Sequence, residues 1–179
     1  MQTPTKKKRK IVRKLLFLLL GISFIFIIVT GNLESYSIYY EQQLASSPKE
    51  RRDNVIKATI INLRTLSYKD IPNMRYDFDG TNFVENQNDS SGNYFPSVLG
   101  NAGRYRYGDK NGYGYHFDAN LNLTYAVKLS STEHKRLDLS QLNEEQLKDE
   151  MYDTLKPIID ARKKPAIFNL QWLYKLLRK

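Results

Sequence analysis

Asp77 and Asp79 are the residues whose types and spacing are suited to covalent chemistry, because a single residue separates the two carboxylates. A carboxylate can act as a nucleophile in group transfer. Other reactive side chains are sparse: the chain has no cysteine, and His116 and His134 are its two histidines. Two imidazoles far apart in the sequence make neither a metal site nor a catalytic triad. A catalytic hypothesis therefore rests on the two aspartates.

The stretch Asp77-Phe78-Asp79-Gly80-Thr81 resembles the D-x-D-G-T motif of haloacid-dehalogenase-like phosphohydrolases. The resemblance implies that Asp77 attacks phosphate, that Asp79 is a general acid and base, and that Mg²⁺ binds beside them. The family's motif follows an apolar strand of a doubly wound sheet, whereas Asn73 and Arg75 precede it here. A hairpin turn at Asp79-Gly80 explains the same residues without catalysis. We therefore predict a protein that is not an enzyme, with phosphohydrolysis as an alternative.

Acidic and amide residues also gather at positions 86–93 and 109–111. Neither group has the D-x-[DN]-x-[DN]-G spacing of a calcium-binding loop. Asn, Asp and Gly are the residues that turns require, so surface turns account for both groups. We predict no catalytic, cofactor-binding or metal-binding residues.

A membrane anchor is the strongest feature of the sequence. Residues 15–33 form a run of nineteen residues without a charge, and a bilayer core about 30 Å thick needs about 17–25 apolar residues. We predict a transmembrane signal anchor there, along which lie Leu15, Leu19, Phe24 and Ile28. Seven basic residues precede it: Lys6, Lys7, Lys8, Arg9, Lys10, Arg13 and Lys14. Basic residues stay on the cytoplasmic side, so residues 1–14 should lie inside and the rest outside.

The alternatives to an uncleaved anchor are a cleaved signal peptide and a buried core helix of a soluble protein, and a pilin-like structural subunit is an alternative function. A signal peptide has the same basic and apolar regions, and Val29-Thr30-Gly31 is the only passable cleavage site. A basic start, an apolar helix and a β meander also resemble type IV pilin subunits. The pilin processing site and the glutamate early in the apolar segment are missing here.

The net charge of +9 is unevenly distributed. Residues 162–179 carry six basic and no acidic groups, while residues 31–161 have a net charge of −4. A mildly acidic body between two basic ends is typical of membrane-flanking charge and gives no nucleic-acid-binding face. An exported domain without cysteine is typical of a bacterial surface.

Helices are predicted on either side of a β region. Ser47, Pro48 and Glu50 form a helix start, so we predict an amphipathic helix from Pro48 to about Ser67. Asn143 caps a second helix with a stripe of Leu147, Met151 and Leu155, which Pro157 should kink or end. A basic amphipathic C-terminal helix is predicted within residues 162–179, starting at Pro165. Its candidate interface residues, for a membrane or for the domain, are Trp172, Tyr174, Lys175 and Arg178.

The β region is predicted as a hairpin followed by a three-stranded meander. A two-residue turn at Asp79-Gly80 would place Tyr76 opposite Phe83. In residues 104–129, all tyrosine, phenylalanine, leucine and valine side chains occupy odd positions and should share one face. That parity requires a three-residue loop at 110–112 with a left-handed Gly112, and an odd-length loop near Asp118. Residues 86–103 are predicted to form a long binding loop.

These patterns predict an α+β fold: an N-terminal transmembrane helix, then a small antiparallel sheet packed by amphipathic helices. We divide the chain into a cytoplasmic segment (1–14), the anchor (15–33), a stalk (34–46), an extracytoplasmic domain (47–161) and the basic C-terminal helix (162–179). The predicted function is a single-pass, non-enzymatic binding, accessory or immunity-type component of a cell-envelope complex. Its expected partners are the lipid bilayer and another envelope protein or a cell-wall component.

Overall fold

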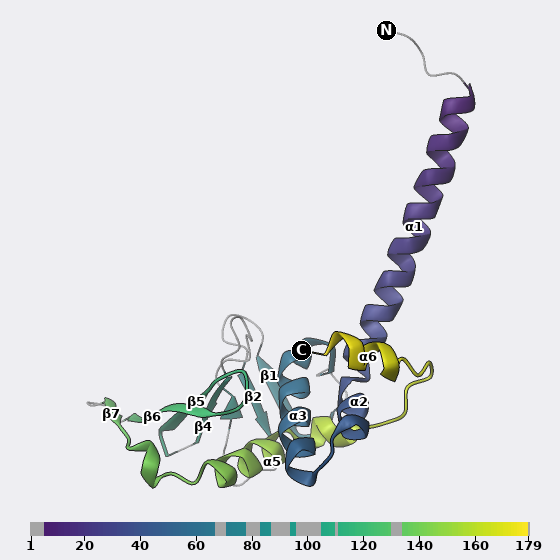
Figure 1. Ribbon diagram of the computed structural model, residues 1–179. Helices are drawn as coiled ribbons and strands as arrows, with labels where there is room; N and C mark the ends of the chain where they lie inside the picture. Colours follow the sequence, from purple (N-terminus) through teal and green to yellow (C-terminus); the bar gives the residue numbers. More distant parts are fainter. Residues whose placement is uncertain are drawn as a thin grey trace.

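A computed structural model describes residues 6–66, 71–77, 83–86, 94–95, 105–109, 111–129 and 134–178. Figure 1 shows one long helix that projects from a folded domain of helices and strands. The fold is mixed α+β with antiparallel strands and a long apolar N-terminal helix, as predicted.

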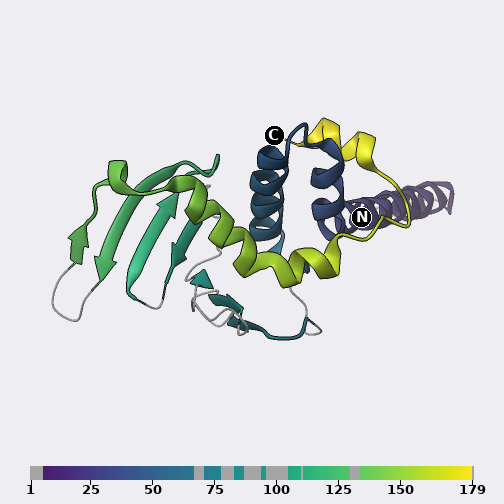
Figure 2. The ribbon, with the colours of Figure 1, turned by 90° about the horizontal axis from the view of Figure 1, so that it is seen from below.

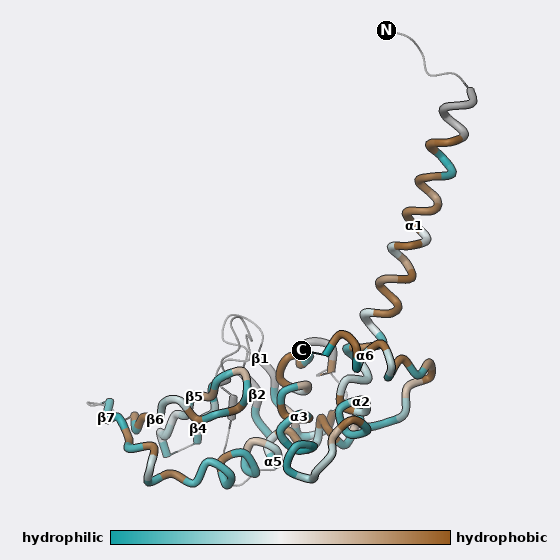
Figure 3. The backbone as a smooth tube through the Cα atoms, viewed as in Figure 1, coloured by the Kyte–Doolittle hydropathy of each residue, from teal (hydrophilic) through white to brown (hydrophobic). Residues whose placement is uncertain are grey.

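Helix α1 (Lys6–Ser35) is long and apolar enough to span a membrane. Its candidate span is Ile11–Ser35; the most apolar window of this span has a mean hydropathy of 2.5 and is not buried by the rest of the protein. Figure 3 shows the hydrophobic colouring along the helix. A signal sequence near the N-terminus meets the same criteria of length and composition.

Helix α2 (Ser37–Leu44) follows α1 after a break at Tyr36. It belongs to the segment that we predicted as a stalk, and it lies within the domain. Ile38 and Tyr40 are both fully buried. The sequence pattern gave no sign of this burial, because the helix has no clear apolar stripe of its own.

Helix α3 (Pro48–Ile61) begins where the capping residues predict. The Ser47 side chain accepts a hydrogen bond of 3.1 Å from the Glu50 N–H, and the Glu50 carboxylate accepts one of 2.8 Å from the Ser46 N–H. The predicted continuous helix is interrupted at Asn62, after which α4 (Leu63–Leu66) begins. The start is therefore confirmed, and the end is corrected.

Helix α5 (Glu144–Arg162) follows a short 3-10 helix, η1 (Leu139–Gln141). The Asn143 side chain caps it by accepting a hydrogen bond of 3.1 Å from the Gln146 N–H, and the predicted stripe is buried. Pro157 does not end the helix, which continues to Arg162. Ile158 and Ile159 are fully buried beyond the proline. Their packing outweighs the hydrogen bond that proline removes.

The strands form two small antiparallel sheets. The first contains β1 (Met74–Asp77), β2 (Phe83–Asn86) and β3 (Tyr94–Phe95), and the second β4 (Tyr105–Gly108), β5 (Tyr113–Phe117), β6 (Leu123–Leu129) and β7 (His134–Arg136). Among the described residues, the pair Tyr94–Gly108 joins the two sheets into one order, β1 to β7. Figure 2 shows α5 running from the strands to α2 and α3.

The register of the β1–β2 hairpin differs from the prediction. Tyr76 pairs with Val84, and Asp77 pairs with Phe83. Five residues lie between Asp77 and Phe83, which is an odd number. A hairpin with a two-residue turn has an even number of residues between every opposed pair. The predicted pairing of Tyr76 with Phe83 is therefore wrong by one residue. The turn itself, with Asp79 and Gly80, lies outside the described residues.

The β4–β5 hairpin has the predicted register. Tyr107 pairs with Tyr115, and Tyr105 pairs with Phe117. Gly112 has a φ of 82°, so the left-handed position is confirmed. The Asp109 side chain accepts hydrogen bonds from the backbone N–H groups of Asn111 (2.8 Å) and Tyr113 (3.1 Å). These short-range bonds fix the loop length, which in turn sets the aromatic face.

A β-bulge between His116 and Phe117 shifts the next pairing by one residue. Phe117 pairs with Leu123 across a connection of odd length, as predicted, but His116 pairs with Tyr125. The buried Ala126 is therefore opposite Tyr115. The prediction that all odd-numbered residues share one face is wrong along β6, because a bulge reverses the parity on its far side.

The core lies where α3 and α5 meet the second sheet. Its fully buried members include Ile56 from α3, Met151 and Leu155 from α5, and Tyr107 and Phe117 from the strands.

Arg52 also joins the two helices, since its guanidinium lies 2.8 Å from Glu145 Oε2 and 2.7 Å from Asp149 Oδ1. Hydrogen bonds from Arg52 and Lys49 lower the pKa of Glu145 to about 2. We assign this charged cluster to fixing α3 against α5.

Gly112→Ala should destabilise the domain by about 1–3 kcal/mol, because alanine is strained at positive φ. An added Cβ would also lie 2.5 Å from the backbone oxygen of Leu129. Urea denaturation of the full chain in detergent micelles measures the loss. Gly114→Ala is the matched control, since its Cβ would lie 3.4 Å from Val127 Cγ1. Equal losses in the two variants would contradict the described turn.

Candidate functional site

The Asp77-x-Asp79 motif has no support from the surrounding fold. Asp77 ends β1, which is an antiparallel strand at one end of the strand order. The resemblance to phosphohydrolases implies a strand within a doubly wound sheet. Asp79 lies outside the described residues, as does most of the predicted binding loop at 86–103.

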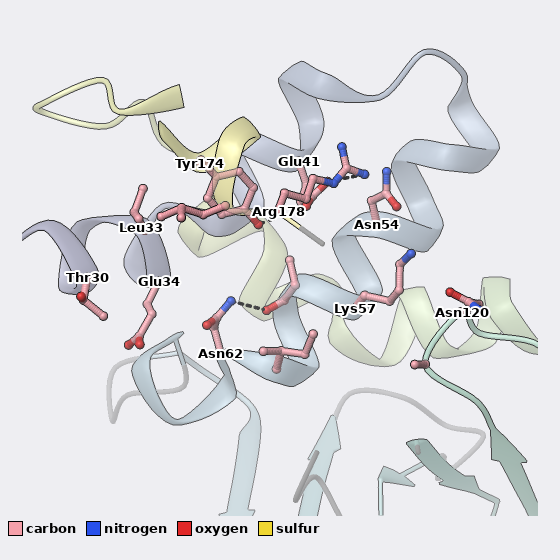
Figure 4. Close-up of a pocket in the computed structure, with 14 residues that line it drawn as sticks. Thr30, Leu33, Glu34, Glu41, Asn54, Lys57, Asn62, Asn120, Tyr174 and Arg178 are labelled. Carbon is pink, nitrogen blue, oxygen red and sulfur yellow. Dashed lines mark hydrogen bonds and ion pairs between the residues drawn. The ribbon is translucent and has the colours of Figure 1, made fainter. Parts of the chain in front are cut away.

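A cavity of about 690 Å³ lies beside the C-terminal end of α1. Its walls come from α1, α2, α3, α6 (Gln171–Leu177) and the turn before β6. Figure 4 shows polar side chains from these separate elements around it. The polar lining includes Glu34, Glu41, Asn54, Lys57, Asn120 and Arg178. Apolar side chains complete it, among them Leu33, Ile61 and Leu177.

Glu41 is the most buried charge in this cavity, with 5% of the residue exposed. The Tyr174 hydroxyl donates a hydrogen bond of 3.1 Å to Glu41 Oε1, and Arg178 Nη2 lies 3.0 Å from Oε2. Burial raises the pKa of Glu41, and the opposing effects of Arg178 and Tyr174 are smaller. The pair Tyr174 and Arg178 therefore connects α6 to α2 through one carboxylate.

Asn54 supplies a buried donor at the cavity wall. It is 5% exposed, and its Nδ2 has no hydrogen-bond partner among the described residues. Asn62 behaves differently, because its Nδ2 donates a hydrogen bond of 3.0 Å to the Ala58 carbonyl. An unpaired buried donor costs free energy, which a ligand oxygen or a water molecule would recover.

The cavity is suited to binding. It combines an apolar wall with a few polar groups of both charge signs, as ligand sites do. Its described lining residues include no histidine, serine or cysteine. A ligand or polypeptide segment with an apolar part and a polar end would satisfy both kinds of wall.

The C-terminal interface residues separate into two pairs. Tyr174 and Arg178 point into the domain and line the cavity. Trp172 and Lys175 border a second, open hollow beside Leu44. Helix α6 covers Gln171–Leu177, so it is shorter than the helix predicted from Pro165.

Glu41 itself was not among the predicted site residues. It lies in α2, between Tyr40 and Gln42, where no motif or apolar periodicity distinguishes it from a surface acid. Its role depends on Tyr174, which is 133 positions away. The only feature of the sequence that could have indicated Glu41 is the presence of an acidic residue within a hydrophobic, tyrosine-rich stretch.

Glu41→Gln should change the pH dependence of stability. The folded state raises the pKa of Glu41 above its ordinary value of 4.5, so folded protein binds this proton more tightly than unfolded protein. Glu41 therefore makes the free energy of unfolding fall as the pH rises from 4.5 through the raised value. The variant should lack this contribution to the decrease in the free energy of unfolding. Urea denaturation of both proteins, from acid to neutral pH, measures it; parallel curves would contradict the burial of this carboxylate.

The fold and the cavity define a class: a small α+β domain carried at the end of a long apolar helix. No known protein family, no curated protein and no solved structure matches the chain. The function is therefore inferred from the residues and their geometry.

Proposed function

We propose that this protein is a single-pass membrane protein that holds a non-enzymatic binding domain at the outer face of the cell membrane. In this role it is an accessory or immunity-type component of a cell-envelope complex. The main observation in support of this proposal is the exposed apolar helix α1, which is attached directly to a folded domain.

Side-chain hydrogen bonds support a fixed attachment. Tyr40 is fully buried, and its hydroxyl donates a hydrogen bond of 2.8 Å to Asn32 Oδ1 at the end of α1. The same hydroxyl accepts one of 3.1 Å from the Leu170 N–H. The helix and the C-terminal segment therefore meet at one buried group, which holds the domain close to the end of the apolar run.

The charge pattern supports the orientation. The seven basic residues between Lys6 and Lys14 precede the apolar run, and basic residues are retained on the cytoplasmic side. The folded domain then lies outside, where a protein without cysteine needs no disulfide chemistry.

The position of the cavity supports a binding role in an envelope complex. Thr30 and Leu33 of α1 lie on its border, so an occupant would contact both the anchor and the domain. A partner protein or cell-wall component at the membrane surface would reach it from the side of the domain that faces the bilayer.

In-cell photo-crosslinking tests this role. A photoreactive residue replaces Lys57 in the cavity, and in a control it replaces Lys135 on β7. We expect a discrete adduct from position 57 that is lost when Ala119→Trp fills the rim of the cavity. Adducts of equal yield from both positions, or no adduct at position 57, would contradict the proposal.

A further inference from the structure

Five large apolar side chains are exposed along the C-terminal segment. The exposed fractions are 82% for Ile167, 69% for Phe168, 68% for Trp172, 73% for Leu176 and 58% for Leu177. Such a concentration of exposed apolar surface in a folded domain marks an interaction surface. We call these five residues the C-terminal apolar patch.

Hydrogen bonds fix the depth of this patch relative to α1. Asn32 Nδ2 donates a hydrogen bond of 3.2 Å to the carbonyl of Phe168. With a rise of 1.5 Å per residue, residues 15–33 span about 27 Å, close to the roughly 30 Å of a bilayer core. Asn32 therefore lies near the outer boundary of the core, and Phe168 lies beside it.

The patch also lies on the side of the domain from which α1 leaves. Figure 1 shows α6 beside the C-terminal end of α1, and Figure 3 shows hydrophobic colour along α6 and the segment before it. A membrane that α1 spans would meet this side of the domain first.

The charges around the patch match a lipid surface. Residues 162–179 have no acidic side chain. Lys164 and Lys175 are exposed, and neither forms an ion pair within the part of the chain that the structure describes. Aromatic and aliphatic side chains with lysines at their edge are typical of segments that lie in the interface of an anionic bilayer.

We propose that residues 164–177 lie in the headgroup region of the bilayer that α1 crosses, with the C-terminal apolar patch inserted at the boundary of the acyl chains. This inference rests on the proposed membrane anchor. It gives the domain a second attachment, which fixes its orientation and holds the rim of the cavity at the membrane surface.

Trp172 is the only tryptophan, so its fluorescence tests the inference in the full, unlabelled chain. The protein is reconstituted singly into nanodiscs of mixed phosphatidylglycerol and phosphatidylcholine. Brominated lipids carry bromine either near the headgroup or near the chain end. We expect blue-shifted emission, protection from acrylamide, and stronger quenching by the bromine near the headgroup.

Two variants in a Trp172→Phe background make the result specific. Phe24→Trp places the probe within α1, where bromine near the chain end should quench it. Lys135→Trp places it on β7, at the end of the domain away from α1, where bromine should have no effect. The first variant tests the anchor and the second tests non-specific contact with lipid.

The outcomes separate the two proposals. Water-like, acrylamide-accessible Trp172 together with a quenched probe at position 24 would overturn the inference and leave the anchor intact. Trp172 that is protected from both acrylamide and bromine would also overturn it, because protein rather than lipid would then cover the patch. An unquenched probe at position 24 would overturn both proposals.

Discussion

The double variant Leu19→Arg, Phe24→Arg should disappear from the membrane fraction of cells. Each arginine near the centre of a membrane helix costs about 2.5–3.5 kcal/mol on insertion, so two cost about 5–7 kcal/mol. Both side chains are exposed on α1, at 54% and 64%, so the substitutions break no contact in the domain. Sedimentation of membranes after an alkaline wash, followed by immunoblotting, measures the effect.

Ile11→Arg is the matched control for this prediction. It adds the same side chain at the basic end of the apolar run, where a long arginine can reach the interface. The control should stay in the membrane. Retention of the double variant after the alkaline wash would contradict a spanning role for α1.

Phe117→Ala should lower the free energy of unfolding by about 3–5 kcal/mol, the usual cost of removing a buried phenylalanine. Phe117 is fully buried and pairs with both Tyr105 and Leu123 beside the β-bulge. Its ring therefore packs where the strands meet the helices. Urea denaturation in detergent micelles, followed by the near-ultraviolet circular dichroism of the tyrosines, measures the loss.

Phe168→Ala is the matched control, because it removes the same atoms from a side chain that is 69% exposed. Its effect on the unfolding of the domain should stay well below that of Phe117→Ala, because the Phe168 ring is not part of the core. Similar losses in the two variants would contradict the placement of Phe117 in the core.

Features that depend on short-range chemistry were predictable from the sequence. Ser47 and Asn143 cap helices because their side chains accept a hydrogen bond from an N–H three residues later. Asp109 and Gly112 fix the length of a hairpin loop through bonds within five residues. From these local rules follow the helix starts, the β4–β5 register and the α+β class.

Features that depend on long-range packing were not predictable. The bulge beside Phe117 changes which residues of β6, odd or even, face the core, and no residue type in the sequence predicts it. The burial of α2 depends on Tyr40, whose partners Asn32 and Leu170 come from opposite ends of the chain. The cavity has the same origin, because its walls come from segments that are close only after folding.

The most direct test of the proposed role is protease treatment of intact cells that express the full chain with a different epitope tag at each terminus. Before digestion, both tags should be on one full-length, membrane-bound chain. After digestion, we expect loss of the C-terminal tag and protection of the N-terminal tag. A protected C-terminal tag would place the domain in the cytoplasm and contradict the account. An N-terminal tag missing before digestion would show that the apolar segment is a cleaved signal.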